Sequence, residues 1–165
     1  MTTRAELAEG LRVALREGLR VMSGFAPDDW ERKVIDEGGT WTRKQAYAHL
    51  TSVAESVPIF VAGLAAGGQQ SGPVLDVDAF NAQMVASKDQ LDGAALMAAY
   101  EAAYHKLIDF VEAMPDDQLH MEAVLPVTYS GEPGKMAGQV ATVLDGALVL
   151  HSLAHIYGAG GSPLS

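Results

Sequence analysis

The sequence predicts an all-α protein that folds as a four-helix bundle, with four long helices and an additional short helix. Apolar residues recur at helical spacing through most of the 165 residues, and β-branched runs with a period of two are scarce. Four segments are long enough for bundle helices and are joined by modest connections. The length and the lack of an internal repeat lead us to expect one domain over residues 1–165.

The first helix is expected to begin after Thr3 and to end near Gly24. Thr3 is followed three positions later by Glu6, the spacing of a capping box that satisfies free backbone donors at a helix start. An apolar stripe then continues to Met22, and Gly24 and Pro27 mark the end of the pattern.

The second helix is expected after an irregular loop over residues 27–40. Thr42 and Gln45 repeat the capping-box spacing, and the apolar pattern continues to about Gly67. Pro58 lies inside this pattern and is expected to kink the helix, because proline lacks an amide donor and its ring clashes with the preceding turn.

The rest of the chain is divided by glycine and proline clusters. We expect a short helix over about 76–87, a long helix over about 92–114 and the last long helix over about 136–157. Residues 119–135 hold two prolines and two glycines and are expected to be irregular, with at most a short extended piece.

Charge and composition exclude several classes of partner. The chain has 21 acidic and 11 basic residues, a net charge of −10, so we expect no nucleic-acid partner and no anionic membrane partner. The N-terminal residues lack the apolar run of a signal peptide, which favours a cytoplasmic location. The longest apolar stretch identified, Val57–Ala66, is about half a membrane span.

The absence of cysteine limits the chemistry. With no cysteine, the 165 residues provide no disulfide, no thiolate zinc ligand and no cysteine nucleophile. Any thiol chemistry must therefore use sulfur from a small molecule.

The histidines are the residues most informative about function. His151 and His155 are four positions apart, so on a helix they lie about 40° apart on one face and roughly 6 Å apart along the axis. That spacing lets two imidazoles bind one metal, as in the HExxH motif of zinc proteases, but the glutamate of that motif is missing here. His49 lies on the apolar stripe of the second helix, while His105 and His120 are expected to be exposed.

Three inward histidines from two helices indicate a shared metal more strongly than three separately satisfied core histidines, although both interpretations remain open. Imidazole ligands favour Zn(II), Ni(II), Fe(II) or Cu(II) over magnesium or calcium. Three protein ligands also leave a coordination position free, as at catalytic metal sites, for water or a thiol. Trp41 is interpreted as packing at the start of the second helix, and Asn81 as either a capping or a binding residue.

Three segments together resemble the DinB-like family, near its mycothiol-dependent maleylpyruvate isomerase branch. They are Trp41-Thr-Arg-Lys-Gln-Ala-Tyr-Ala-His49-Leu50, Asp76-Val-Asp-Ala-Phe-Asn81 and His151-Ser-Leu-Ala-His155. The resemblance implies a four-helix bundle with one divalent metal, commonly zinc or nickel, on His49, His151 and His155. It also implies a homodimer and a low-molecular-weight thiol such as mycothiol or bacillithiol.

The resulting hypothesis is a metal-binding DinB-like protein that acts as a thiol-dependent S-transferase or isomerase on an electrophilic small molecule. Two alternatives stay open at this stage: a non-catalytic dimeric module that binds a metal or ligand, and a metal-dependent hydrolase. The sequence assigns no catalytic residue and no substrate-binding residue. The family's isomerases carry a further C-terminal domain that is not seen in this sequence, so we expect a reaction other than maleylpyruvate isomerisation.

Overall fold

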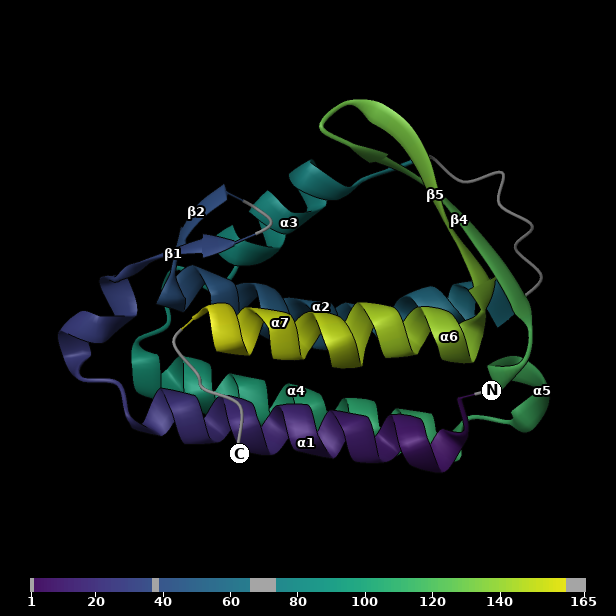
Figure 1. The fold of residues 1–165 in the computed structure, drawn as a ribbon, viewed down its shortest axis with the longest axis horizontal. Helices are drawn as coiled ribbons and strands as arrows, with labels where there is room; N and C mark the ends of the chain where they lie inside the picture. Colours follow the sequence, from purple (N-terminus) through teal and green to yellow (C-terminus); the bar gives the residue numbers. More distant parts are fainter. Residues whose placement is uncertain (1, 37–38, 66–73, 160–165) are drawn as a thin grey trace.

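A computed structural model describes residues 2–36, 39–65 and 74–159, and it confirms the helical bundle. The bundle is made of α1 (Arg4–Ser23), α2 (Arg43–Ala65), α4 (Gly93–Ala113), and the composite of α6 (Val140–Leu144), the π-helical η2 (Asp145–Leu150) and α7 (His151–Gly158). Figure 1 shows the long helices lying side by side, with α6 and α7 following one another along the last of them. The smaller helices are the 3-10 helix η1 (Pro27–Glu31), the expected short helix α3 (Val77–Ala86) and α5 (Asp116–Leu119).

Both predicted capping boxes form. The Thr3 side chain accepts a hydrogen bond from the Glu6 amide, and the Glu6 carboxylate accepts one from the Thr3 amide. Likewise, the Gln45 amide donates to Thr42 Oγ1 while the Thr42 amide donates to Gln45 Oε1. These pairs fix where α1 and α2 begin. α2 continues as a helix through Pro58.

Two regions expected to be irregular contain strands. Within residues 27–40, β1 (Lys33–Asp36) pairs antiparallel with β2 (Gly39–Thr42). A second sheet has the order β3-β4-β5, formed by β3 (Leu75–Asp76), β4 (Glu122–Tyr129) and β5 (Glu132–Gln139).

The expectation of irregular structure over residues 119–135 was therefore wrong. Ser130 and Gly131 have φ angles of 50° and 79°, as in the two-residue turns whose twist matches a β-hairpin. β5 takes residues that were assigned to the last helix, so this helix begins at Val140 and not near residue 136.

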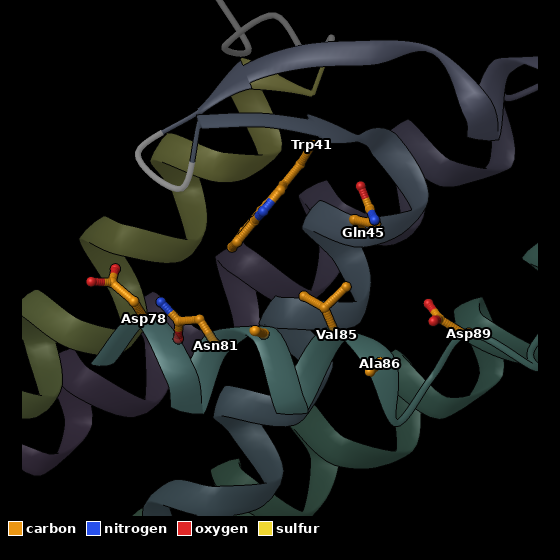
Figure 2. A pocket seen from close by; sticks show the side chains of 8 residues that line it. Trp41, Gln45, Asp78, Asn81, Val85, Ala86 and Asp89 are labelled. Atoms are coloured by element: carbon orange, nitrogen blue, oxygen red, sulfur yellow. The ribbon is translucent and has the colours of Figure 1, made fainter. Parts of the chain in front are cut away.

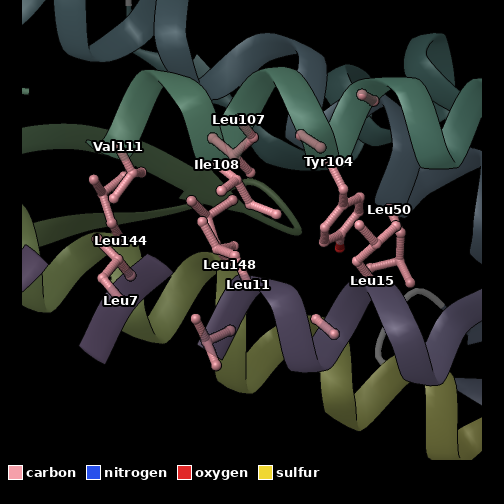
Figure 3. Close-up of a cluster of buried hydrophobic side chains, with 14 of the residues drawn as sticks. Leu7, Leu11, Leu15, Leu50, Tyr104, Leu107, Ile108, Val111, Leu144 and Leu148 are labelled. Carbon is pink, nitrogen blue, oxygen red and sulfur yellow. The ribbon is translucent and has the colours of Figure 1, made fainter. Parts of the chain in front are cut away.

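The core lies between the four long helices. Figure 3 shows leucines of α1 facing α4 and the last helix across the centre of the bundle. Fully covering a leucine or valine side chain stabilises the fold by roughly 1.5–3 kcal/mol, so this layer supplies much of the bundle's stability. The buried side chains labelled in Figure 3 are Leu7, Leu11, Leu15, Leu50, Tyr104, Leu107, Ile108, Val111, Leu144 and Leu148.

Among the residues that the structure describes, one helix, Val140–Gly158, is long and apolar enough to be a candidate membrane span, whereas the sequence pointed to Val57–Ala66, whose last residue lies outside the described ranges. By length and composition alone Val140–Gly158 could cross a membrane. In the structure it contacts α1 and α2 inside the bundle, and core helices of soluble proteins share this composition. The expectation of no membrane partner stays a prediction.

Candidate metal centre

Three histidines converge between α2 and α7. The Nε2 atom of His151 lies 2.9 Å from Nε2 of His49 and 2.9 Å from Nε2 of His155. One ring nitrogen from each residue belongs to a group in which all atoms lie within 4.8 Å of one another. The residues singled out from the sequence are thus brought together, from segments about a hundred positions apart.

Helix register explains this convergence. The cap at Thr42 starts α2 so that His49 falls on its buried face, beside Ala46 and Leu50. His151 and His155 occupy one face of α7, one turn apart. His49 and His155 are 2% and 3% exposed, whereas His151 is only partly buried, so His151 is the most solvent-accessible of the three.

A hydrogen bond to α4 and a preceding π-helical segment characterise α7. The hydroxyls of Tyr104 on α4 and Ser152 on α7 are hydrogen-bonded at 2.6 Å, and both residues are buried. The π-helical η2 comes directly before His151, and π-turns recur at functional sites because the wider turn changes the face that later residues present. The sequence pattern gave no signal for η2.

The donor set fits a metal cation. An imidazole nitrogen carries either one proton or one lone pair in the ring plane, so it makes one well-directed hydrogen bond. His151 Nε2 nevertheless has two ring nitrogens at 2.9 Å, and a single bond cannot point at both. A cation at the centre of the group would accept a lone pair from each ring, as zinc does from histidine.

Trp41 covers one side of the histidines. Its ring is stacked on His155, with ring centroids 5.9 Å apart and planes at 14°, and it lies 5.0 Å from the ring of His49. β2 carries Trp41 into this position just before α2. Its interpretation as packing for the helix start alone was therefore incomplete, because the indole also forms a wall of the histidine site.

A cleft lies next to Trp41. It has a volume of about 350 Å³, and Figure 2 shows it between Trp41, the first turns of α2 and the helix α3. Asn81, for which the sequence left a capping and a binding role open, lines this cleft. The lining residues are Trp41, Gln45, Asp78, Asn81, Ala82, Val85, Ala86 and Asp89.

The other histidines lie outside the site, as expected. The His105 side chain on α4 is 63% exposed and lies 4.0 Å from a Glu101 carboxylate oxygen. His120 is also exposed. Both therefore serve as control positions for experiments on the histidine group.

Three buried tyrosines, Tyr47, Tyr100 and Tyr104, pack against one another. The Tyr100 hydroxyl donates to the carbonyl of Ala14 at 2.9 Å, and its ring packs on Tyr104 with centroids 4.3 Å apart. Burial raises the pKa of Tyr104 to about 12, because the phenolate would be charged in an apolar environment. Burial also raises the pKa values of Tyr47 and Tyr100.

A family model described as the mycothiol maleylpyruvate isomerase N-terminal domain matches residues 11–142. The match includes His49 and ends before His151 and His155. A comparison with curated proteins finds no match.

Similar solved structures share the DinB-like helical fold. The mycothiol-dependent maleylpyruvate isomerase has 17% identity and a TM-score of 0.71, over 96% of this chain and 61% of that chain. The sibling lethal factor precursor DfsB has 13% identity and a TM-score of 0.74, over 96% and 94%. The colibactin self-resistance protein ClbS, solved with double-stranded DNA, has 12% identity and a TM-score of 0.69, over 97% and 93%. This chain thus spans less than two thirds of the isomerase.

Proposed function

This chain belongs to the mycothiol maleylpyruvate isomerase N-terminal domain family, and from that premise we propose that His49, His151 and His155 hold one divalent metal for thiol-dependent chemistry. The reaction is an S-transfer or isomerisation of an electrophilic small molecule, with a low-molecular-weight thiol such as mycothiol or bacillithiol. The observation that carries the proposal is that the Nε2 atoms of His49 and His155 each lie 2.9 Å from Nε2 of His151.

The three imidazole ligands limit which metal ions would bind at this site. Three imidazoles favour zinc or nickel over the oxygen-seeking cations, and three protein ligands leave a coordination position for a further ligand. Held by the three histidines, the metal would act as a Lewis acid. It would lower the pKa of a thiol coordinated at the free position, so that the thiolate forms near neutral pH.

The chain's own residues prepare this chemistry. The three rings would offer their lone pairs to the metal in the neutral form. His49 and His155 are buried, at 2% and 3% exposed. Trp41 covers the flank of His155 and excludes water there, while the partly exposed side of His151 leaves a path for ligands. Because the chain has no cysteine, the sulfur must come from the ligand.

The remaining partners follow from the same family membership. We propose a cytoplasmic homodimer that takes small molecules. The neighbour ClbS is solved with DNA, but this chain carries a net charge of −10, which opposes general binding to a phosphate backbone.

Metal content and thiol binding test the proposal together. Purified chain loaded with Co(II) should hold about one metal per chain, and His151→Ala should lose most of it, because two imidazoles bind far more weakly than three. His105→Ala is the matched control and should keep the metal. Added mycothiol should give a sulfur-to-cobalt absorption band in the loaded chain and none in His151→Ala.

Each negative result has a distinct meaning. Equal metal content in the two variants would overturn the histidine site. A bound metal with no absorption change for any thiol, combined with metal-dependent ester cleavage, would replace the transferase with the hydrolase alternative.

A further inference from the structure

We propose that the cleft beside Trp41 is the substrate subsite of the histidine centre and that it selects ligands without negative charge. The ligands expected are neutral or cationic molecules that donate hydrogen bonds, and not carboxylates. The inference rests on the proposed function, since it gives the cleft a role in the same reaction.

Position connects the cleft to the histidines. Trp41 lines the cleft and also packs against His49 and His155, with centroid distances of 5.0 and 5.9 Å. Figure 2 shows the indole extending from β2 toward Asn81 on α3. A ligand in the cleft therefore lies against the same ring that covers the metal ligands.

The charges around the cleft are acidic. Asp78 and Asp89 are its ionisable lining residues, and no lysine or arginine is among the lining residues that the structure describes. The Lys44 ammonium donates to the backbone carbonyl of Asp89 at 2.9 Å, so a cation lies near that end of the cleft. No comparable cation contacts Asp78 within residues 2–36, 39–65 and 74–159. A ligand carboxylate at the Asp78 end would face a like charge that no lysine or arginine of the described residues offsets.

The hydrogen-bonding groups favour a donor-rich ligand. Asp78 accepts a hydrogen bond from the Ser130 amide through one oxygen, Oδ2, which leaves its other oxygen for a ligand. Gln45 Oε1 is already used by the Thr42 amide. The Asn81 amide has no protein partner among the described residues, so it can bond a ligand. A ligand ammonium could also lie over the indole face, where cations are attracted to the ring.

The cleft size agrees with a small ligand. Its volume of about 350 Å³ is near the lower end of the range for small-molecule sites, roughly 300–1,000 Å³. Val85, on the same helix as Asp78 and Asn81, adds an apolar surface to the cleft.

Three thiols of similar size and different charge test the selectivity. Cysteamine, 2-mercaptoethanol and mercaptoacetate would be titrated into the Co(II)-loaded full chain at low salt, with the sulfur-to-cobalt band as the measure of binding. Because each thiol has its own affinity for cobalt, the informative quantity is how the cysteamine-to-mercaptoacetate affinity ratio differs between variants.

Asp78→Asn should lower that ratio by about tenfold, because it removes one charge near the ligand while keeping an acceptor for the Ser130 amide. Asp109→Asn, an exposed carboxylate on α4, is the matched control and should leave the ratio unchanged. Asp89→Asn should have a smaller effect, because Lys44 lies close to it. A ratio that is the same in wild type and in both cleft variants would overturn the inference.

The two proposals fail separately. If Co(II) does not bind through the histidines, the proposed function fails, and the same thiols are then followed in the metal-free chain by tryptophan fluorescence. If the cysteamine-to-mercaptoacetate affinity ratio changes in Asp78→Asn in that experiment, the cleft remains a charge-selective site. An unchanged ratio would overturn the inference. If Co(II) and thiols bind but Asp78→Asn leaves the ratio unchanged, the metal site stands and the selectivity fails.

Discussion

The Tyr104–Ser152 hydrogen bond should stabilise the helix that carries two of the three histidines. The two hydroxyl oxygens are 2.6 Å apart, and the residues are 1% and 2% exposed, so water cannot replace either partner. Tyr104→Phe keeps the ring and removes only the hydroxyl. It leaves the Ser152 hydroxyl without this partner, which should lower the free energy of unfolding by about 1–3 kcal/mol.

A double-mutant cycle isolates this bond. Ser152→Ala should also be destabilising, because it removes the hydrogen bond from the other side and leaves the buried Tyr104 hydroxyl without Ser152 as a partner. The variant with both changes should lose less than the sum, with a coupling energy of about 1–2 kcal/mol. Urea unfolding measures the free energies, and the exposed Tyr129→Phe control should change them by less than about 0.5 kcal/mol.

The same variants connect stability to the site. Ser152 adjoins His151, so Tyr104→Phe should also weaken Co(II) binding, because α7 is less firmly held against α4. The reasoning is refuted if the two single changes add without coupling, since the hydroxyls would then not interact in the folded state.

Three further predictions concern stability. Gly18→Ala should destabilise the fold by roughly 2 kcal/mol or more in thermal unfolding, because a Cβ would lie 2.4 Å from the buried Tyr100 hydroxyl. Gly146→Ala is the control and should not cause this loss, because a Cβ there meets nothing within 4 Å. Equal losses of stability in the two variants would contradict the steric argument. Thr3→Ala should cost about 1 kcal/mol through its lost cap, and an unchanged unfolding midpoint would argue against the capping box. The neutral Tyr104 phenol, with its pKa raised from 10 to about 12, contributes roughly 2–3 kcal/mol below pH 10 that is lost as the pH rises to about 12. Tyrosinate absorbance and circular dichroism should therefore change together, and early ionisation of all tyrosines in folded protein would contradict the burial.

The helices and the histidine group were predictable because their signals are local. Capping boxes need only four residues, and an apolar stripe shows which face of a helix is buried. His49 and the pair His151 and His155 fall on such stripes, so their inward direction followed from spacing alone.

Other features depend on contacts that spacing does not encode. The β4–β5 hairpin was missed because Pro126 and several glycines argued against a strand. The turn at Ser130 and Gly131 can be recognised as a hairpin turn only when the pairing of β4 with β5 is known. Trp41 was assigned to local packing because its neighbour in space, His155, is remote in the sequence.

X-ray absorption at the metal edge of the zinc- or nickel-loaded chain tests the central claim most directly. We predict three imidazole nitrogens at about 2.0–2.1 Å from a zinc ion, with the imidazole signal reduced in His151→Ala and unchanged in His105→Ala. A first shell of oxygen atoms alone, or a spectrum that does not respond to His151→Ala, would contradict the claim that these three histidines form the metal centre.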